Sequence, residues 1–304
     1  MKVFVSYAHT QGAWVWGRLV PILKAGGAEA LTDHERFKAG LAVVGQMDGL
    51  QDQAERQLIC WTADHAASDA CRHEWRRALA KDPEFTAGLI LLARLDGAAL
   101  PAELPADLHQ PLYIDLRDDS KPGSWQLLFR GCAAEFGTSA PAWLGARDEV
   151  ADALRRFRSV NLVVRGRKLR WRDLIEDVKE RAAQDLALVD LQDPRAHTRE
   201  GLLATILVAL GMGAMKLPKK PQDLAVFTDR ILALGGKVRI GLTHCDLIPH
   251  RSAYDVDLFA GLRWLVMEGG RPMTLFVQSR TPFGQLLPRG HPLSEIDFTA
   301  VDLR

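Results

Sequence analysis

Residues 3–9 of the chain read VFVSYAH, an apolar run that turns polar at Ser6. Three consecutive apolar residues are typical of a strand that is buried on both faces of a parallel sheet. In an open parallel sheet, ligands bind beyond the carboxyl ends of the strands. Ser6, Tyr7 and His9 are therefore candidates for a binding site at the end of a first strand.

Short apolar runs alternate with amphipathic stretches along the rest of the sequence. Further strands are expected at 58–61, 88–92, 112–114, 160–164, 186–191, 238–242, 273–278 and, as an edge strand, 298–303. Helices are expected at 14–24, after Trp125, and at 148–157, 169–183, 198–210, 222–234 and 256–268. This alternation predicts parallel sheets that are covered by helices on both faces.

Length and composition indicate a two-domain protein. A chain of 304 residues suggests two domains at roughly 150 residues each. The small residues and proline at 138–141 interrupt the pattern and give expected domains of 1–138 and 139–304.

Charge and cysteine usage narrow the class of protein. Thirty-nine Lys and Arg against 38 Asp and Glu leave a net charge of +1. This net charge is too small to attract the whole chain to nucleic acid or to an anionic membrane. The four cysteines form no C-x-x-C motif. Neither a membrane-spanning run nor a signal peptide is recognisable, so a cytoplasmic protein is expected.

Several motifs, in order, resemble those of bacterial TIR domains. The opening resembles F-[IV]-S-Y-[SA]-H, and Asp33 and Gly40 match the aspartate of the second strand and the glycine of the next loop. Residues 62–74 resemble S-P-x-[YF]-x-x-S-x-W-C-x-x-E, and residues 101–116 resemble the closing stretch. The resemblance covers residues 1 to about 138, which is nearly half of the chain.

The resemblance implies a flavodoxin-like fold with five parallel strands. Many bacterial TIR domains cleave NAD⁺ at the nicotinamide–ribose bond, and such proteins commonly act in antiphage defence by depleting NAD⁺; others make a cyclic or modified ADP-ribose. The family's key glutamate corresponds to Glu74. The expected substrate-binding residues are Ser6, Tyr7, His9, Asp33, Phe37, Ser68 and Cys71. Self-association is implied, NAD⁺ is substrate, and no metal or other cofactor is expected.

The position of Glu74 on its helix agrees with a catalytic role. At 100° per residue, Cys71, Trp75 and Ala78 share one apolar arc, and Glu74 lies at its edge. A carboxylate there can stabilise the oxocarbenium-like state of N-glycosidic cleavage, and nicotinamide leaves as a neutral molecule without a general acid. The alternative is a surface glutamate paired with Arg77 one turn later.

The sequence departs from the family pattern at Ala70, where the family has a tryptophan that can stack on the substrate. Trp61 is a possible substitute, although a place in the core is the favoured interpretation. Phe37 is the better candidate for a loop residue that packs on ligand or on a neighbouring subunit. Asp33 could contact substrate or cap backbone amides, and Ser6 and Tyr7 could line the site or simply end the strand. The missing tryptophan also supports a second hypothesis, a non-enzymatic TIR scaffold.

The second half resembles, more weakly, a P-loop NTPase of the STAND type whose nucleotide site has degenerated. Residues 165–168 read RGRK where G-x-x-x-x-G-K-[ST] is expected, with one glycine and no following Ser or Thr, and Asp246 lies beyond the strand that resembles Walker B. No ATP hydrolysis is expected, whereas nucleotide binding stays open. This half is expected to bind a protein sensor or activator.

Two polar clusters in the second half have alternative interpretations. The basic cluster of Arg165, Arg167, Lys168, Arg170 and Arg172 is either a solvated helix start or a contact for an anion or nucleic acid. His244, Cys245, Asp246 and His250 do not have the spacing of a metal site.

Overall fold

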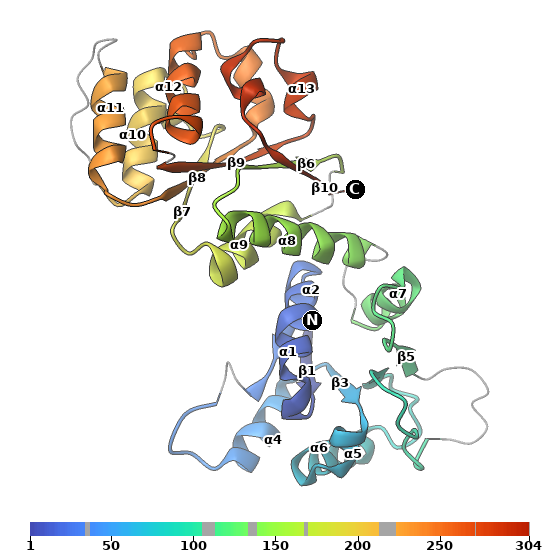
Figure 1. The fold of residues 1–304 in the computed structure, drawn as a ribbon. Coiled ribbons are helices and arrows are strands. Elements are labelled where there is room, and N and C mark those ends of the chain that lie inside the picture. Colours follow the sequence, from blue (N-terminus) through green and yellow to red (C-terminus); the bar gives the residue numbers. More distant parts are fainter. Residues whose placement is uncertain are drawn as a thin grey trace. The chain divides into compact units, whose positions relative to one another are not determined.

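The computed structural model describes residues 1–33, 37–104, 113–132, 139–166, 170–212, 223–270 and 272–303 (Figure 1). Arg167 and Lys168 of the basic cluster, and half of the expected closing stretch at 101–116, lie outside these residues. The chain divides into two compact units, Met1–Leu144 and Gly145–Arg304. The division lies six residues beyond the expected boundary at 138.

The first unit contains a five-stranded parallel sheet in the order β2-β1-β3-β4-β5. Its strands are β1 (Lys2–Ser6), β2 (Glu29–Leu31), β3 (Arg56–Trp61), β4 (Ile90–Arg94) and β5 (Tyr113–Asp115). The order 2-1-3-4-5 is that of flavodoxin-like folds, and it places the topological switch point between β1 and β3. The expected fold class is thereby confirmed for this unit.

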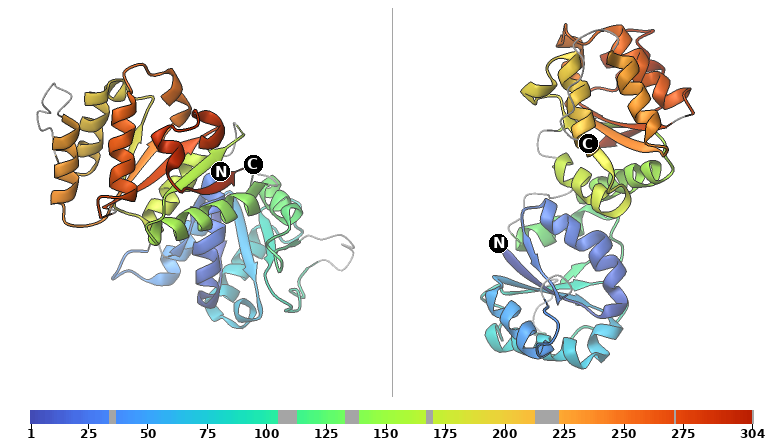
Figure 2. Two further views of the ribbon diagram at one scale, coloured as in Figure 1. Left: turned by 45° about the horizontal axis from the view of Figure 1, so that its top comes forward. Right: turned by 90° about the vertical axis from the view of Figure 1, so that its left-hand side faces the viewer.

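Helices cover both faces of this sheet (Figure 2). One face carries α7 (Pro122–Gly131) and the helical segment that comprises α1 (Gly12–Trp14), a wide turn at Val15–Leu19 and α2 (Val20–Ala25). The other face carries α4 (Val43–Gln53), α5 (Ala63–Ala67) and α6 (Asp69–Lys81). Strand interiors such as 3–6 and 57–61 are buried, as expected for a sheet packed on both sides.

The second unit is also a parallel α/β domain, as the sequence predicts. Its sheet has the order β10-β6-β9-β8-β7, and every described pair of neighbouring strands is parallel. The strands are β6 (Val160–Val164), β7 (Leu186–Asp190), β8 (Val238–Thr243), β9 (Met273–Ser279) and β10 (Thr299–Leu303). The last strand lies at the edge, as expected for residues 298–303.

The described helices of the second half follow the expected pattern except at its start and near its end, where a short helix was not predicted. They are α8 (Ala140–Arg155), α9 (Trp171–Ala182), α10 (Arg199–Ala209), α11 (Asp223–Ala233), α12 (Val256–Met267) and α13 (Phe283–Leu286). Helix α8 begins eight residues before the expected residue 148. Pro141 does not prevent this, because the backbone N–H groups in the first turn of a helix have no intrahelical acceptor, so the N–H that proline lacks is not needed there.

Among the residues that the structure describes, we find no helix of the length and apolarity that a membrane crossing requires.

Candidate functional site

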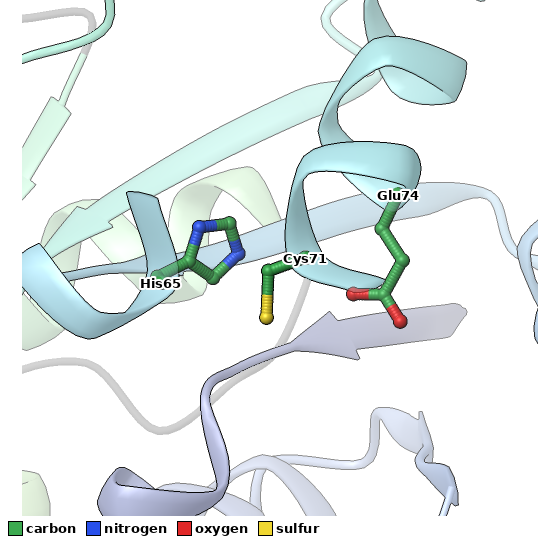
Figure 3. A group of neighbouring side chains, drawn as sticks. All are labelled: His65, Cys71 and Glu74. Carbon is green, nitrogen blue, oxygen red and sulfur yellow. The ribbon is translucent and has the colours of Figure 1, made fainter. Parts of the chain in front are cut away.

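The polar side chains of Ser6, His65 and Glu74 come from separate elements and meet beyond the switch point of the first sheet. Figure 3 shows His65 and Glu74 at this place. Ser6 is the last residue of β1 and is paired in register with Ile59 of β3. His65 comes from α5, which follows β3, and Glu74 from α6. All three are buried: Ser6 is 1%, His65 0% and Glu74 8% exposed. The site therefore lies where an open α/β sheet binds ligands.

The two helices that support the site, α5 and α6, each begin at a residue whose hydroxyl group caps the helix. Thr62 Oγ1 accepts a hydrogen bond from the backbone N–H of His65 (3.1 Å) at the start of α5. Ser68 Oγ accepts one from the N–H of Cys71 (3.3 Å) at the start of α6. These are N-cap interactions, which typically stabilise a helix by about 1 kcal/mol. Ser68, an expected substrate-binding residue, thus serves here as a helix cap.

The carboxyl group of Glu74 is held by Ser6. The Ser6 hydroxyl donates a short hydrogen bond to Glu74 Oε2, and its Oγ lies 2.8 Å from His65 Nε2. Burial raises the pKa of Glu74 from 4.5 to about 7, with the Ser6 hydrogen bond opposing this rise and the charge of Asp33 adding to it. Glu74 consequently titrates close to neutral pH, as catalytic carboxyl groups often do.

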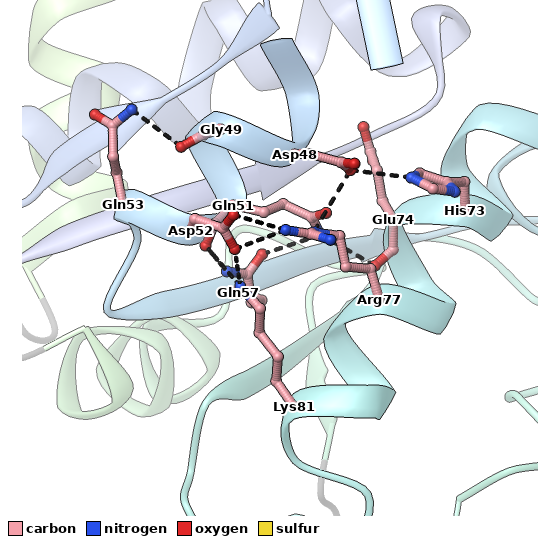
Figure 4. A network of polar contacts seen from close by, with 10 residues as sticks. All are labelled: Asp48, Gly49, Gln51, Asp52, Gln53, Gln57, His73, Glu74, Arg77 and Lys81. Atoms are coloured by element: carbon pink, nitrogen blue, oxygen red, sulfur yellow. Dashed lines mark hydrogen bonds and ion pairs between the residues drawn. The ribbon is translucent and has the colours of Figure 1, made fainter. Parts of the chain in front are cut away.

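The alternative pairing of Glu74 with Arg77 is not what the structure contains. Arg77 turns toward α4, where its Nη2 lies 2.7 Å from both carboxylate oxygens of Asp52 and its Nε 3.5 Å from Asp48 (Figure 4). Gln51 Nε2 donates to the backbone carbonyl of Glu74 (3.0 Å), which ties α4 to α6. Glu74 is therefore directed toward β1 while its neighbours on α6 bind α4.

Tyr7 and Asp33 form a second polar pair at this edge of the sheet. The Tyr7 hydroxyl donates to Asp33 Oδ1 (2.8 Å) and accepts from Trp16 Nε1 (3.0 Å). Burial is the main cause that raises the pKa of Tyr7. His9 is exposed, with its ring edge-on to Tyr7 at 6.3 Å between centroids. These residues border the site without a described hydrogen bond to Glu74.

The remaining candidates are dispersed. Phe37 packs against a core cluster of Phe4, Leu31 and Leu50, so its ring is half-buried in its own subunit. Trp61 is 7% exposed and donates from Nε1 to the carbonyl of Ala99 (2.8 Å), which agrees with its favoured interpretation as a core residue. Ala70, where the family has tryptophan, is exposed on α6.

His65 was missed by the sequence analysis, and Cys71 lies with it beside Glu74. A ring nitrogen of His65, the sulfur of Cys71 and a carboxylate oxygen of Glu74 all lie within 4.8 Å of one another (Figure 3). Burial raises the pKa of the Cys71 thiol to about 11, so the sulfur is a neutral thiol near pH 7. The signal for His65 was present in the motif, since His65 occupies the position where the family has Tyr or Phe.

The second unit has a cavity at the carboxyl ends of β6, β8 and β9. Its volume is about 480 Å³, and Arg165, Arg172, Arg280, His244, Trp171 and Asp246 are among the lining residues. His244 has a left-handed backbone (φ 57°), and its Nδ1 lies 2.7 Å from Asp190 Oδ1. Cys245 is fully buried, and Asp246 accepts a hydrogen bond from the Arg280 N–H (2.7 Å). The cavity is thus rimmed by cations.

Comparison with known proteins assigns the first unit. Residues 3–128 match the family model described as TIR domain, whereas the search of curated proteins found no match. Among solved structures, the TIR domain of the Toll-related receptor TRR-2 from Hydra magnipapillata is 21% identical, with a TM-score of 0.35, and the match covers 43% of this chain and 97% of that one.

Other solved structures match across about half of each chain. Drosophila ORC bound to AT-rich DNA and Cdc6 is 16% identical (TM-score 0.39), with 53% of this chain and 53% of that one covered. The Aeropyrum pernix ORC2 protein in ADPNP–ADP complexes is 17% identical (TM-score 0.39), with 52% and 47% covered. The family match, the 2-1-3-4-5 strand order and the position of Glu74 agree: residues 3–128 of this chain form a TIR domain.

Proposed function

We propose that the protein is an NAD⁺ glycohydrolase whose catalytic residue is Glu74. The observation that carries the proposal is a buried carboxyl group at the β1–β3 switch point, hydrogen-bonded by Ser6 and titrating near pH 7. An ionised carboxylate with one fixed donor and little surrounding water is suited to stabilise a developing positive charge. Bacterial TIR domains with NAD⁺-cleaving activity have their key glutamate at the corresponding position.

The proposed reaction requires little more from the protein than this carboxylate. The bond between ribose C1′ and the nicotinamide nitrogen breaks, and its electron pair stays with nicotinamide, which leaves neutral. The ribosyl cation is stabilised by ionised Glu74 until a water oxygen bonds to C1′ and releases a proton to solvent. The products are nicotinamide and ADP-ribose, or a cyclic product if an adenine nitrogen attacks in place of water.

The restricted access to Glu74 supports a control of the activity by assembly. Only 8% of Glu74 is exposed, so the carboxyl group is almost closed off from a substrate in this conformation. We propose that self-association through TIR domains opens and completes the site, and that the second unit responds to a protein sensor or activator. In a cytoplasmic antiphage role, the activated assembly would deplete the NAD⁺ of an infected cell.

Nicotinamide release should depend strongly on pH. Since burial raises the pKa of Glu74 to about 7, the ionised fraction falls about fivefold from pH 7 to pH 6 and nearly tenfold for each further pH unit. We expect kcat/KM for NAD⁺ to rise through this range and to level off above about pH 8. The measurement is nicotinamide release by the assembled full chain from pH 5 to 9, with an enzyme-free control. The absence of release from every assembled form would refute the proposed function.

A non-enzymatic scaffold is the second candidate, and Ala70 favours it. The exposed Ala70 offers no aromatic surface for stacking on the substrate at the position where the family has tryptophan. A scaffold would self-associate and recruit other TIR proteins with no loss of NAD⁺. Measuring assembly and nicotinamide release on the same sample separates the two candidates.

The second unit is proposed to bind a partner without turning over ATP. Hydrolysis needs a glycine-rich backbone loop around the phosphates and a hydroxyl that holds Mg²⁺. Residues 165–168 contain one glycine and are followed by Leu169. We expect phosphate release from ATP to stay at the level of a protein-free control, with and without Mg²⁺. Turnover that is lost in Lys168→Ala would contradict this expectation.

A further inference from the structure

His65 is a buried titratable residue to which the proposed reaction gives no role. Its side chain is fully buried, and its Nε2 lies 2.8 Å from the Ser6 hydroxyl that donates to Glu74. Its ring also packs on Trp61, with 5.3 Å between centroids. The family has an aromatic residue at this position, which could pack on Trp61 but could not, as phenylalanine, form the hydrogen bond. The polar function of His65 therefore needs its own explanation.

The hydrogen bonds determine which nitrogen of His65 carries the proton. Burial lowers the pKa of His65 to about 4, so the ring is neutral near pH 7 and has one N–H. Ser6 has a single proton, and it is directed at Glu74 Oε2. Ser6 Oγ must then accept from His65, which places the ring proton on Nε2. In the described part of the chain, the buried Nδ1 has no hydrogen-bond partner, as suits a nitrogen without a proton to donate.

The opposite tautomer would work against the ionised form of Glu74. With its proton on Nδ1, His65 would accept the Ser6 proton at Nε2 and would leave an unpartnered N–H donor in the interior, which is unfavourable. Glu74 would lose the Ser6 donor and would have to become protonated to hydrogen-bond Ser6 itself. The two tautomers of His65 thus match the two protonation states of Glu74.

Other titratable groups face Glu74 but cannot replace this effect. Charge repulsion from Asp33, beyond β2, favours protonation of Glu74. Cys71, one turn earlier on α6, is a neutral thiol directed at the Tyr7 carbonyl (3.5 Å). Asp48 of α4 and His73 of α6 pair with each other at 3.0 Å. Among the described contacts, the Ser6 hydroxyl is the donor that favours the carboxylate.

We propose that His65 is a positioning residue: its Nε2–H holds the Ser6 hydroxyl toward Glu74 and thereby favours the ionised form of Glu74. This inference rests on the proposed function for its biological meaning, but the hydrogen-bond relay itself does not. It makes the pH at which the site becomes active a property of the His65–Ser6 pair. A TIR domain with phenylalanine at this position would need a more alkaline medium for the same ionised fraction.

The test is a direct titration of Glu74 in the full chain, followed by NMR of ¹³C-labelled glutamate carboxyl groups. The Glu74 signal is assigned by its loss in Glu74→Gln. In His65→Phe we expect the titration midpoint to move to higher pH by about half a pH unit or more, because the Ser6 donor is no longer held in place. His65→Gln, which retains an N–H at the Nε2 position, should restore the wild-type midpoint. His73→Phe, on the same helix as Glu74 but directed at Asp48, is the matched control and should leave the midpoint unchanged (Figure 4).

An unchanged or lowered midpoint in folded His65→Phe would overturn the proposal. A lowered midpoint would mean that His65 accepts the Ser6 proton in the wild type. Should His65→Phe not fold, ¹⁵N NMR of the wild-type histidines at pH 8, where Glu74 is mostly ionised, decides: a protonated Nε2 with a bare Nδ1 supports the relay, and the reverse refutes it.

The proposed function can fail separately from the relay. If the midpoint moves as expected but no assembled form releases nicotinamide, the relay stands and the glycohydrolase does not. If nicotinamide is released and the midpoint does not move, the glycohydrolase stands and the relay does not. Where both are correct, the pH–rate profile of His65→Phe should move to higher pH together with the Glu74 titration.

Discussion

Glutamine in place of Glu74 is expected to lower nicotinamide release by about a hundredfold to a thousandfold, the range seen when one electrostatic contact to a transition state is removed. The substitution keeps size and shape, and the Ser6 hydroxyl can still donate to the amide oxygen. What disappears is the negative charge beside the breaking C1′–N bond. The measurement is kcat/KM for NAD⁺ in the assembled full chain at pH 8, where wild-type Glu74 is mostly ionised.

Two controls make this result interpretable. Glu84→Gln removes an exposed carboxylate just beyond α6 and should retain wild-type release. Glu74→Gln should assemble to the same size as the wild type, because the substituted side chain is buried and is not a surface contact. Full activity in Glu74→Gln would remove Glu74 from the reaction. Unchanged assembly with no release in either protein would favour the scaffold.

The two sheets could be predicted because their strands are buried on both faces. Such strands appear in the sequence as apolar runs, as at 3–5 and 162–164, and no partner needs to be known to recognise them. The proximity of Ser6 and Glu74, 68 residues apart, follows from the same geometry, because parallel strands direct their carboxyl ends to one edge. Topology thus predicts the edge of the sheet at which these side chains meet, whereas the choice of Glu74 came from the resemblance to TIR domains.

Contacts between helices could not be predicted in this way. Arg77 has an i−3 carboxylate in Glu74, yet it pairs with Asp52 on α4, and this choice depends on how the two helices pack. The role of His65 was hidden because it depends on a hydroxyl 59 residues away. Phe37 remains a candidate for contact with a ligand or neighbour, and its partial packing against the cluster of Phe4, Leu31 and Leu50 becomes apparent only in the folded loop. Spacing along the sequence does not determine such choices.

Glu74→Gln is also expected to stabilise the TIR domain, by an amount that depends on pH. The folded protein binds the Glu74 proton more tightly than the unfolded chain does, because burial raises the pKa from 4.5 to about 7. The stability associated with this proton is therefore fully present below pH 4.5 and is lost as the pH rises through 7. At about 1.4 kcal/mol for each pH unit between the two values, the loss is on the order of 3 kcal/mol.

Glutamine resembles the protonated acid and cannot ionise, so Glu74→Gln should avoid this loss. We expect the free energy of unfolding of the variant to equal that of the wild type at pH 4 and to exceed it by roughly 2–3 kcal/mol at pH 8. Denaturant unfolding of both proteins across this pH range measures the difference. The effects of other ionisable groups cancel, because both proteins contain them. The Glu84→Gln control should show no such pH dependence, since Glu84 is exposed.

A difference that stays constant from pH 4 to 8 would mean that Glu74 titrates alike in the folded and unfolded chains. A difference that grows with pH would identify a carboxylate held at a cost to stability, as is expected of a residue kept for its chemistry.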